Sequence, residues 1–309
     1  MKKIYLMLAA ALMTAGIMSA QDISSVTLIY NQGVGEIQLG NMEAALGHFE
    51  NALSQAEALG DEGAEIAANC KNTIPALMLS IAKDQIKADN YDGALEQLAK
   101  TIEKAKAYEN AEVLADAEEL VPQVNMQKGN NLIKVKDFAG AVAVFEQIVA
   151  ADSTNAMAAL RLGQSYMATG KTAEAENAYL LAARQGQDDQ AYKQLSNMYV
   201  KQAAAALKAK KYADAIEAAD KSNSYKENAT AYKVAGTAAS QAQKNAEAIT
   251  YLEKYLELSP NAKDAVQMKY TIAATAQTMG DKAKAKEYYQ MIVSDPKFGP
   301  TAQEMLKTL

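Results

Sequence analysis

Seven segments of the chain share one pattern of small, apolar and polar positions. In each, a short polar break precedes an alanine, and a bulky or hydrophobic residue follows four positions later. Residues four apart lie on the same face of an α-helix, so each segment is predicted to form a helix that buries this face. The alanines are Ala45, Ala94, Ala141, Ala175, Ala215, Ala248 and Ala285, and the residues four positions later are Phe49, Leu98, Phe145, Tyr179, Ala219, Leu252 and Tyr289.

A partner helix is predicted before each break. Gly or Asn in these breaks can adopt the left-handed conformation that ends a helix. Each partner helix also carries a small residue that allows two helices to approach closely. These residues are Gly33, Ala82, Gly129, Gly163, Ala203, Gly236 and Ala273. Each segment is therefore expected to form a hairpin of two helices.

The fourth segment shows the pattern most completely. It reads Leu162-Gly163-x2-Tyr166, turns at Gly170-Lys171, and continues as Ala175-x3-Tyr179-x2-Ala182. This resembles the tetratricopeptide repeat, and the resemblance runs from about residue 25 to residue 298. The chain departs from the family pattern because it has no Trp and because Ala219 stands where a large residue is usual. The resemblance implies an all-α fold, a right-handed α-solenoid of about seven hairpins closed by a C-terminal capping helix.

The spacing of the alanines predicts longer helices in the first half of the chain. Ala45 and Ala94 are 49 residues apart, whereas Ala141 and Ala175 are 34 apart. About 14 extra residues make four helical turns and keep the same face buried. Long helices are therefore expected from Asp61 toward Ile86 and from Asn110 toward Val135, and Pro75 and Pro122 should kink them or start new helices. The expected organisation is a single solenoid over 21–309, with elongated hairpins over 22–150, regular hairpins over 151–298 and a capping helix over 299–309.

The N-terminus predicts export. Met1-Lys2-Lys3, an apolar run over 4–18 and Ser19-Ala20 follow the order of a secretory signal peptide, expected to be cleaved after Ala20. No later stretch approaches membrane length, so the mature protein should have no integral membrane segment. We expect a periplasmic or secreted protein, with outer-membrane association as a further option.

Composition argues against several classes of function. The net charge is −6, and the chain lacks the local basic run that nucleic-acid binding needs. His48 is the only histidine and Cys70 the only cysteine, so common metal-ligand sets cannot form within one chain. No nucleophile, base and orienting group were found together, and therefore neither an enzyme nor a cofactor is expected.

The resemblance places the binding surface on the first helix of each hairpin, where residues beside the small packing position face a concave groove. The expected groove residues are Tyr30, Val34, Lys83, Gln123, Asn130, Arg161, Gln164, Lys233, Thr237 and Tyr270. Some members of the family clamp a C-terminal carboxylate. Asn130 and Arg161 resemble parts of such a clamp, although Met126 stands where a lysine would complete it.

These features together favour a non-catalytic protein–protein interaction scaffold or adaptor. It would be exported to the periplasm or cell envelope and would bind a peptide or protein partner, for example within an envelope-associated complex. The alternative is a secreted or surface-exposed adhesin, or a peptide- or glycan-binding protein. The sequence leaves both open.

Overall fold

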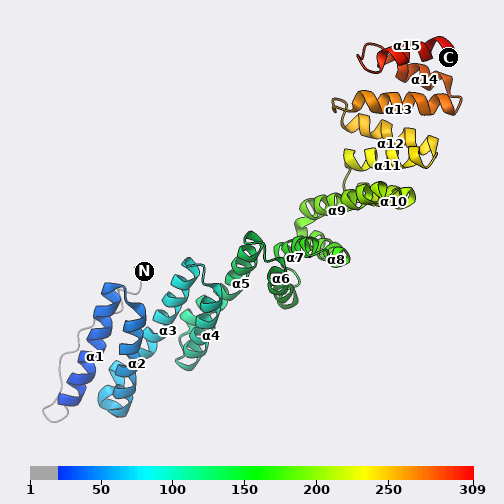
Figure 1. Ribbon diagram of the computed structural model, residues 1–309. Coiled ribbons are helices and arrows are strands. Elements are labelled where there is room, and N and C mark those ends of the chain that lie inside the picture. Colours follow the sequence, from blue (N-terminus) through cyan, green and yellow to red (C-terminus); the bar gives the residue numbers. More distant parts are fainter. Residues whose placement is uncertain (1–19) are drawn as a thin grey trace. The chain divides into compact units, whose positions relative to one another are not determined.

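The computed structural model describes residues 20–309, with side chains from Ile23 onward. This part of the chain contains fifteen α-helices and no strand (Figure 1), which confirms the expected all-α repeat solenoid. The first helices of the seven hairpins are α1 (Ala20–Leu39), α3 (Ala64–Lys87), α5 (Ala111–Lys134), α7 (Ala156–Ala168), α9 (Asp188–Lys208), α11 (Ala229–Gln241) and α13 (Ala265–Thr278). The second helices are α2 (Met42–Ala58), α4 (Tyr91–Ala107), α6 (Phe138–Ala151), α8 (Thr172–Ala182), α10 (Tyr212–Tyr225), α12 (Asn245–Leu258) and α14 (Lys282–Gln290), and α15 (Gly299–Thr308) follows them.

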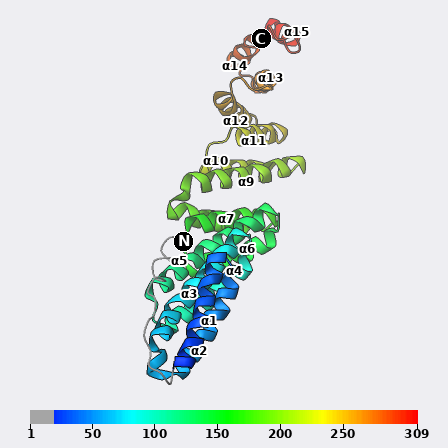
Figure 2. The ribbon, with the colours of Figure 1, turned by 90° about the vertical axis from the view of Figure 1, so that its left-hand side faces the viewer.

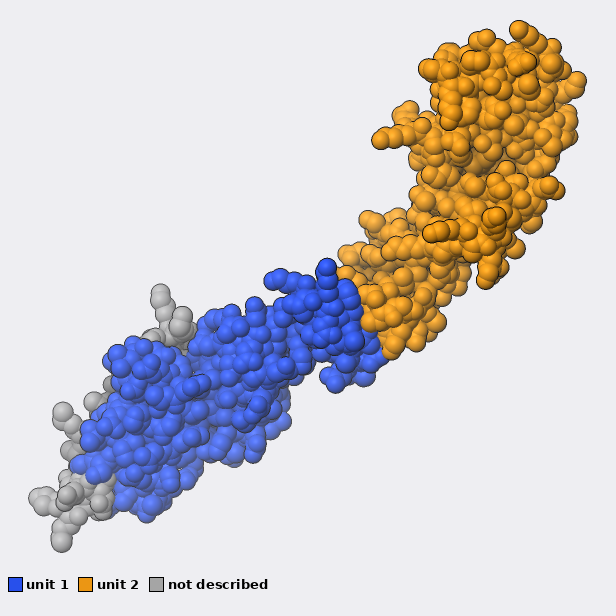
Figure 3. Space-filling model, viewed as in Figure 1, with its two compact units in different colours: residues 1–152 blue, residues 153–309 orange. Residues whose placement is uncertain are grey.

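The chain divides into two compact units (Figure 3), which are described separately. Unit 1 comprises residues 1–152 and contains the hairpins α1/α2, α3/α4 and α5/α6. Unit 2 comprises residues 153–309 and contains the other four hairpins and α15. Within each unit, every helix packs against the next helix in the sequence, as α9 and α10 do in Figure 2. The predicted signal peptide, residues 1–20, lies outside the described residues except for Ala20.

The core follows the sequence pattern closely. All seven repeat alanines, and the residues four positions after them, are buried. The small residue of the first helix lies against that second residue. A methyl group added to Gly129 would come within 2.5 Å of Phe145 Cζ, and one added to Gly163 within 2.6 Å of Tyr179 Cδ1. In these two hairpins, close packing of the helices therefore depends on a missing side chain opposite a large one.

The turns between paired helices differ from the expectation in residue type. In every hairpin, the residue five positions before the repeat alanine has a positive φ angle. It is glycine in three hairpins, but Asp89, Lys136, Lys210 and Gln243 occupy the position in the others. Four turns thus adopt the left-handed conformation without the Gly or Asn that was expected there, because the packing of both helices fixes the reversal.

The two predicted long helices are present. Both α3 and α5 are 24 residues long, and each runs through its proline without a new helix beginning there. Near Pro75, a side chain from the next long helix reaches the backbone of α3, since Asn110 Nδ2 donates to the carbonyl oxygen of Asn72 at 3.2 Å. Asn110 also caps α5, because its Oδ1 accepts from the Val113 amide at 3.1 Å. In unit 2, α9 is 21 residues long, although this segment was expected to be of regular length.

The fifth hairpin packs differently from the others, as the departure at Ala219 suggested. Ala203 and Ala219 are both fully buried in place of a small and a large residue. Beside them, the buried hydroxyl groups of Ser196 and Ser222 lie 2.9 Å apart, and Ser222 Oγ also donates to the carbonyl oxygen of Ser196. A hydrogen-bonded pair therefore replaces part of the apolar contact between α9 and α10.

The last hairpin is covered by α15, as expected of the capping helix. Ala302 is buried, and Met305 and Leu306 pack partly buried against the same cluster as Ile272 and Tyr289. Among the described helices, none combines the length and apolar character needed to cross a membrane.

Candidate protein-binding surface

All ten predicted groove residues lie on first helices, and none is fully buried. Unit 1 holds Tyr30, Val34, Lys83, Gln123 and Asn130, on α1, α3 and α5, and unit 2 holds Arg161, Gln164, Lys233, Thr237 and Tyr270, on α7, α11 and α13. The two residues of the suggested carboxylate clamp, Asn130 and Arg161, therefore belong to different units. Whether these side chains contact a partner stays a prediction.

The aromatic members of this set contribute to hairpin packing. The ring of Tyr30 meets Phe49 edge-on, with 5.1 Å between centroids. Tyr270 contacts Tyr289 at 6.0 Å and Phe298 at 5.1 Å. Val34 packs against the core of the first hairpin. These side chains thus stabilise the fold, and only their outer faces are accessible to a partner.

Two of the three cationic members are already paired with carboxylates. Lys83 Nζ lies 3.8 Å from Asp116 Oδ2. Lys233 Nζ lies 3.1 Å from Asp264 Oδ2 and also sits over the ring of Tyr255. The hydrogen bond from Tyr255 and the contact with Lys233 hold the pKa of Asp264 below its usual range. These lysines therefore link neighbouring helices.

Arg161 is the exception. Its Nη1 donates to Gln164 Oε1 at 3.0 Å, and no ion pair in the described part of the chain involves it. Its Nε is buried and has no hydrogen-bond acceptor. A guanidinium group that lacks a carboxylate retains strong donors for a ligand, and its planar shape suits carboxylates and backbone carbonyls. Of the three cationic groove residues, Arg161 is therefore the one that the described structure does not pair with a carboxylate.

Two of the other polar members form hydrogen bonds within their own helix. Gln123 Nε2 donates to Glu119 Oε1 at 3.3 Å on the same helix. Thr237 Oγ1 donates to the carbonyl oxygen of Lys233 at 2.8 Å. Asn130 and Gln164 are exposed.

Sequence reasoning missed a cluster around Glu176 in unit 2. Its carboxylate accepts from the hydroxyl groups of Tyr199 and Tyr225, at 2.6 and 2.8 Å, and lies 2.9 Å from Lys221 Nζ. Partial burial acts to raise the pKa of Glu176, but these hydrogen bonds outweigh it and lower the pKa below its usual range. Tyr192 extends the stack of tyrosine rings at 6.0 Å from Tyr225. These residues come from three helices, and no local spacing in the sequence indicates that they meet.

Family comparison agrees with this geometry. Models of the tetratricopeptide repeat match residues 132–198, 229–262 and 266–292. The last two segments cover the hairpins α11/α12 and α13/α14. These segments of the chain are tetratricopeptide repeats. The hairpins outside the matched segments show the same burial of the repeat alanine and of the residue four positions later.

Solved structures give only distant likenesses. A MamA protein is 18% identical with a TM-score of 0.38, and the match covers 59% of this chain and 96% of that one. YrrB, described as a TPR protein with an unusual peptide-binding site, is 18% identical with a TM-score of 0.34, covering 60% and 91%. A tetratricopeptide repeat protein from Parabacteroides merdae is 10% identical with a TM-score of 0.31, covering 92% and 98%. No curated protein matches the chain.

Tetratricopeptide repeats typically form non-catalytic scaffolds for protein–protein interaction. This chain therefore has the architecture of an interaction scaffold, with protein or peptide as the class of partner.

Proposed function

We propose that this protein is an exported scaffold that holds a peptide segment of a partner protein against the exposed side of its first helices. In unit 2, the Arg161–Gln164 pair on α7 is the main polar contact. The guanidinium group of Arg161, which has no carboxylate partner in the described structure, carries this proposal, because Lys83 and Lys233 each lie beside a carboxylate of the chain itself.

A rigid first helix favours such binding. The side chains of α7 are positioned by packing before a partner arrives, so less conformational entropy is lost on binding. Hydrogen bonds from a charged donor contribute about 1.5–3 kcal/mol each, more than bonds between neutral groups. One arginine in a preformed surface can therefore decide where a partner carbonyl or carboxylate lies.

The binding proposal can be tested with the two arginines of the chain, Arg161 and Arg184. Proteins retained by the immobilised mature chain, residues 21–309, would be identified by mass spectrometry, and the partner would then be purified and titrated. Arg161→Ala should raise the Kd for that partner about tenfold or more. A tenfold change corresponds to a loss of about 1.4 kcal/mol of binding free energy. Arg184 is exposed and lies outside the first helices, so Arg184→Ala is the matched control and should change Kd little. Equal effects of both variants would contradict the proposed site.

Export is part of the same proposal, and it rests on the charged, apolar and small-residue order of positions 1–20. N-terminal sequencing of the protein from the cells that produce it should give Gln21 as the first residue. Cell fractionation should recover the protein in the periplasm or envelope. Recovery in the culture medium or on the outer surface would instead favour the adhesin or glycan-binding alternative, and an intact Met1 in the cytoplasm would contradict export.

A further inference from the structure

The outer side of α1 is uncovered by any other described helix, whereas the same side of later first helices is buried. Leu28, five residues before the small packing residue Gly33, is 61% exposed. Five later hairpins follow another hairpin within their own unit, and in each of them the equivalent side chain is buried. These side chains are Leu77, Val124, Met198, Ala231 and Met268. Leu28 is therefore exposed because no described hairpin precedes its own.

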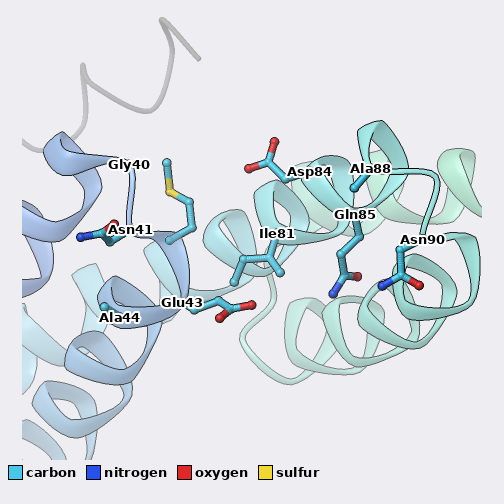
Figure 4. A pocket seen from close by; sticks show the side chains of 10 residues that line it. Gly40, Asn41, Glu43, Ala44, Ile81, Asp84, Gln85, Ala88 and Asn90 are labelled. Atoms are coloured by element: carbon cyan, nitrogen blue, oxygen red, sulfur yellow. The ribbon is translucent and has the colours of Figure 1, made fainter.

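The second hairpin shows what kind of element fits this side of a first helix. Leu77 of α3 belongs to the same apolar cluster as Leu53 of α2. Figure 4 shows the turn end of this junction, where Glu43 reaches from the start of α2 toward the side of α3 that carries Ile81. The second helix of one hairpin thus covers the first helix of the next. The outer side of α1 has the form of a docking site for a helix.

The uncovered side of α1 consists of residues spaced by three or four positions, which lie on one face of a helix. It is opposite the face of α1 that buries Val26, Gly33 and Ile37. Leu39 at its end is 73% exposed, and a methyl group added to Gly35 would meet no atom within 4 Å. This set, called the α1 stripe below, is Ser24, Leu28, Asn31, Gly35 and Leu39.

The α1 stripe is complementary to its own reverse. With a second α1 antiparallel to the first and the two-fold axis between positions 31 and 32, Leu28 of one copy faces Gly35 of the other. Leu39 then faces Ser24. A large side chain meets a small one along the whole contact, as Phe49 meets Gly33 within the first hairpin.

Charge also favours a second copy as the occupant. No residue from Ile23 to Gly35 is charged, and the carboxylate of Glu36 accepts a hydrogen bond from Asn41 Nδ2 at 2.7 Å. The chain has a net charge of −6, so two copies repel each other over most of their surfaces. An uncharged helix face offers no complementary group to an acidic or basic partner, but it lets a second copy approach.

We propose that α1 docks on α1 of a second copy of this chain, in an antiparallel dimer with two-fold symmetry. A helix of 20 residues is about 30 Å long, and one such contact buries less area than a permanent interface needs. The dimer is therefore weak, with an expected Kd of about 1–100 µM. This face is separate from the Arg161 surface and does not depend on it. A dimer would present two copies of that surface to a partner.

Self-association of the mature chain, residues 21–309, tests the proposal directly. Sedimentation velocity over about 1–300 µM should show monomer converting to dimer. Leu28→Arg should raise the dimer Kd about tenfold or more, because it buries a charge against a helix face without a carboxylate. Leu258→Arg is the matched control, since Leu258 is 41% exposed on α12, and it should leave the Kd unchanged. Far-UV circular dichroism confirms that each variant is folded.

Gly35→Ala separates docking from local stability. Alanine favours a helix more than glycine does, and the added methyl group has space within one copy. The variant should therefore resist urea better than the native chain at concentrations where both are monomeric. Its dimer Kd should nevertheless rise about threefold or more, because the methyl group fills the space that Leu28 of the second copy occupies. An unchanged dimer Kd would contradict the docking of Leu28 on Gly35.

Disulfide trapping tests the antiparallel register. Gln32→Cys lies beside the two-fold axis and should link two copies under mild oxidation. Leu39→Cys should not, because the two positions would lie roughly 20 Å apart along the helices. The native Cys70 is fully buried. A chain that stays monomeric up to about 300 µM, equal effects of Leu28→Arg and Leu258→Arg, or linkage through position 39 would each overturn the proposal.

Discussion

At the level of single residues, glycine has two different roles in this chain. Gly163 provides space, because a methyl group there would lie 2.6 Å from the ring of Tyr179. Gly170 provides backbone conformation, because its φ is +80° and no atom lies within 4 Å of an added methyl group. The sequence predicted both roles from the repeat pattern. It did not predict that Lys136 and Lys210 adopt the same left-handed conformation as Gly170, since lysine carries no signal for it.

The close approach at Gly163 can be tested with a double-mutant cycle. Gly163→Ala should lower the free energy of unfolding by about 1–3 kcal/mol, because the new methyl group overpacks the interface with Tyr179. Tyr179→Ala should cost about 3–5 kcal/mol by opening a cavity. The double variant reproduces the alanine pair of the fifth hairpin, so its loss should be smaller than the sum of the two single losses. Urea denaturation of the four proteins measures the coupling, and strict additivity would show that the two positions do not contact each other.

In the turns with a left-handed residue other than glycine, a substitution is predicted to increase the stability of the protein. Lys210→Gly should raise the free energy of unfolding by about 0.5–1 kcal/mol, because a left-handed residue with a side chain costs about 1–2 kcal/mol that glycine avoids. Lys208→Gly, two residues earlier within α9, is the control and should cost about 1 kcal/mol. Thermal denaturation followed by circular dichroism measures both changes. A loss of stability with Lys210→Gly would mean that the turn is not strained.

At the level of elements, the sequence predicted the seven hairpins and both long helices, because their apolar period is local. It left open what the prolines would do. Neither proline starts a helix, and near Pro75 the side chain of Asn110 reaches the carbonyl oxygen of Asn72. Contacts between residues 38 positions apart depend on how the helices stack. The spacing of residues in a single sequence does not predict such contacts. For the same reason the Glu176 cluster was missed, although its tyrosines were visible.

The two bonds of Asn110 can be separated by substitution. Asn110→Asp keeps an oxygen to cap α5 but loses the donor to Asn72, and it should cost about 1 kcal/mol. Asn110→Ala loses both bonds and should cost about 2 kcal/mol. Equilibrium urea denaturation distinguishes these values. Equal losses for the two variants would show that the bond to Asn72 contributes nothing.

At the level of the whole molecule, lysine–carboxylate pairs join neighbouring helices in both units, and unit 2 adds bonds from tyrosine hydroxyl groups. Of the sixteen tyrosines in the chain, twelve lie in unit 2 and three in the described part of unit 1. In unit 2, tyrosine hydroxyl groups donate to carboxylates of other helices, as Tyr251 does to Asp220 and Tyr288 to Glu253. In unit 1, lysine–carboxylate pairs such as Lys128–Asp92 connect the helices, and the described tyrosines make no hydrogen bond to a carboxylate of another helix. This asymmetry predicts different responses to pH.

Unit 2 should lose more stability in alkali than unit 1, because it holds more tyrosines with a raised pKa. Burial, followed by hydrogen bonding to a carboxylate, raises the pKa of Tyr225 and of Tyr255 to about 12, from an ordinary value of 10.0. A raised pKa in the folded state means that the stabilisation is complete below pH 10 and is lost as the pH rises toward 12. In unit 1, burial raises the pKa of Cys70 to about 12, so that unit also loses some stability. Urea denaturation at pH 8 and pH 11 should therefore show a loss of stability that is larger in unit 2 than in unit 1.

The two units can be followed separately in the intact protein. Cys70, the only cysteine, is fully buried in unit 1, and its reaction with a thiol reagent reports the opening of that unit. Tyrosinate absorbance reports mainly unit 2, where most tyrosines lie. Equal destabilisation of both units at pH 11, or of unit 1 alone, would contradict the assignment.

The small residue of each first helix and the large residue sixteen positions later constrain how homologous sequences can diverge. A substitution that adds volume at position 33 or 129 is tolerated only if the ring at position 49 or 145 shrinks in compensation. Drift at such a pair should therefore be concerted, and an alignment of homologues should show the two columns covarying in volume. The fifth hairpin already has alanine at both positions. In homologues, a larger residue could therefore replace the alanine of either helix without a prior change in the other.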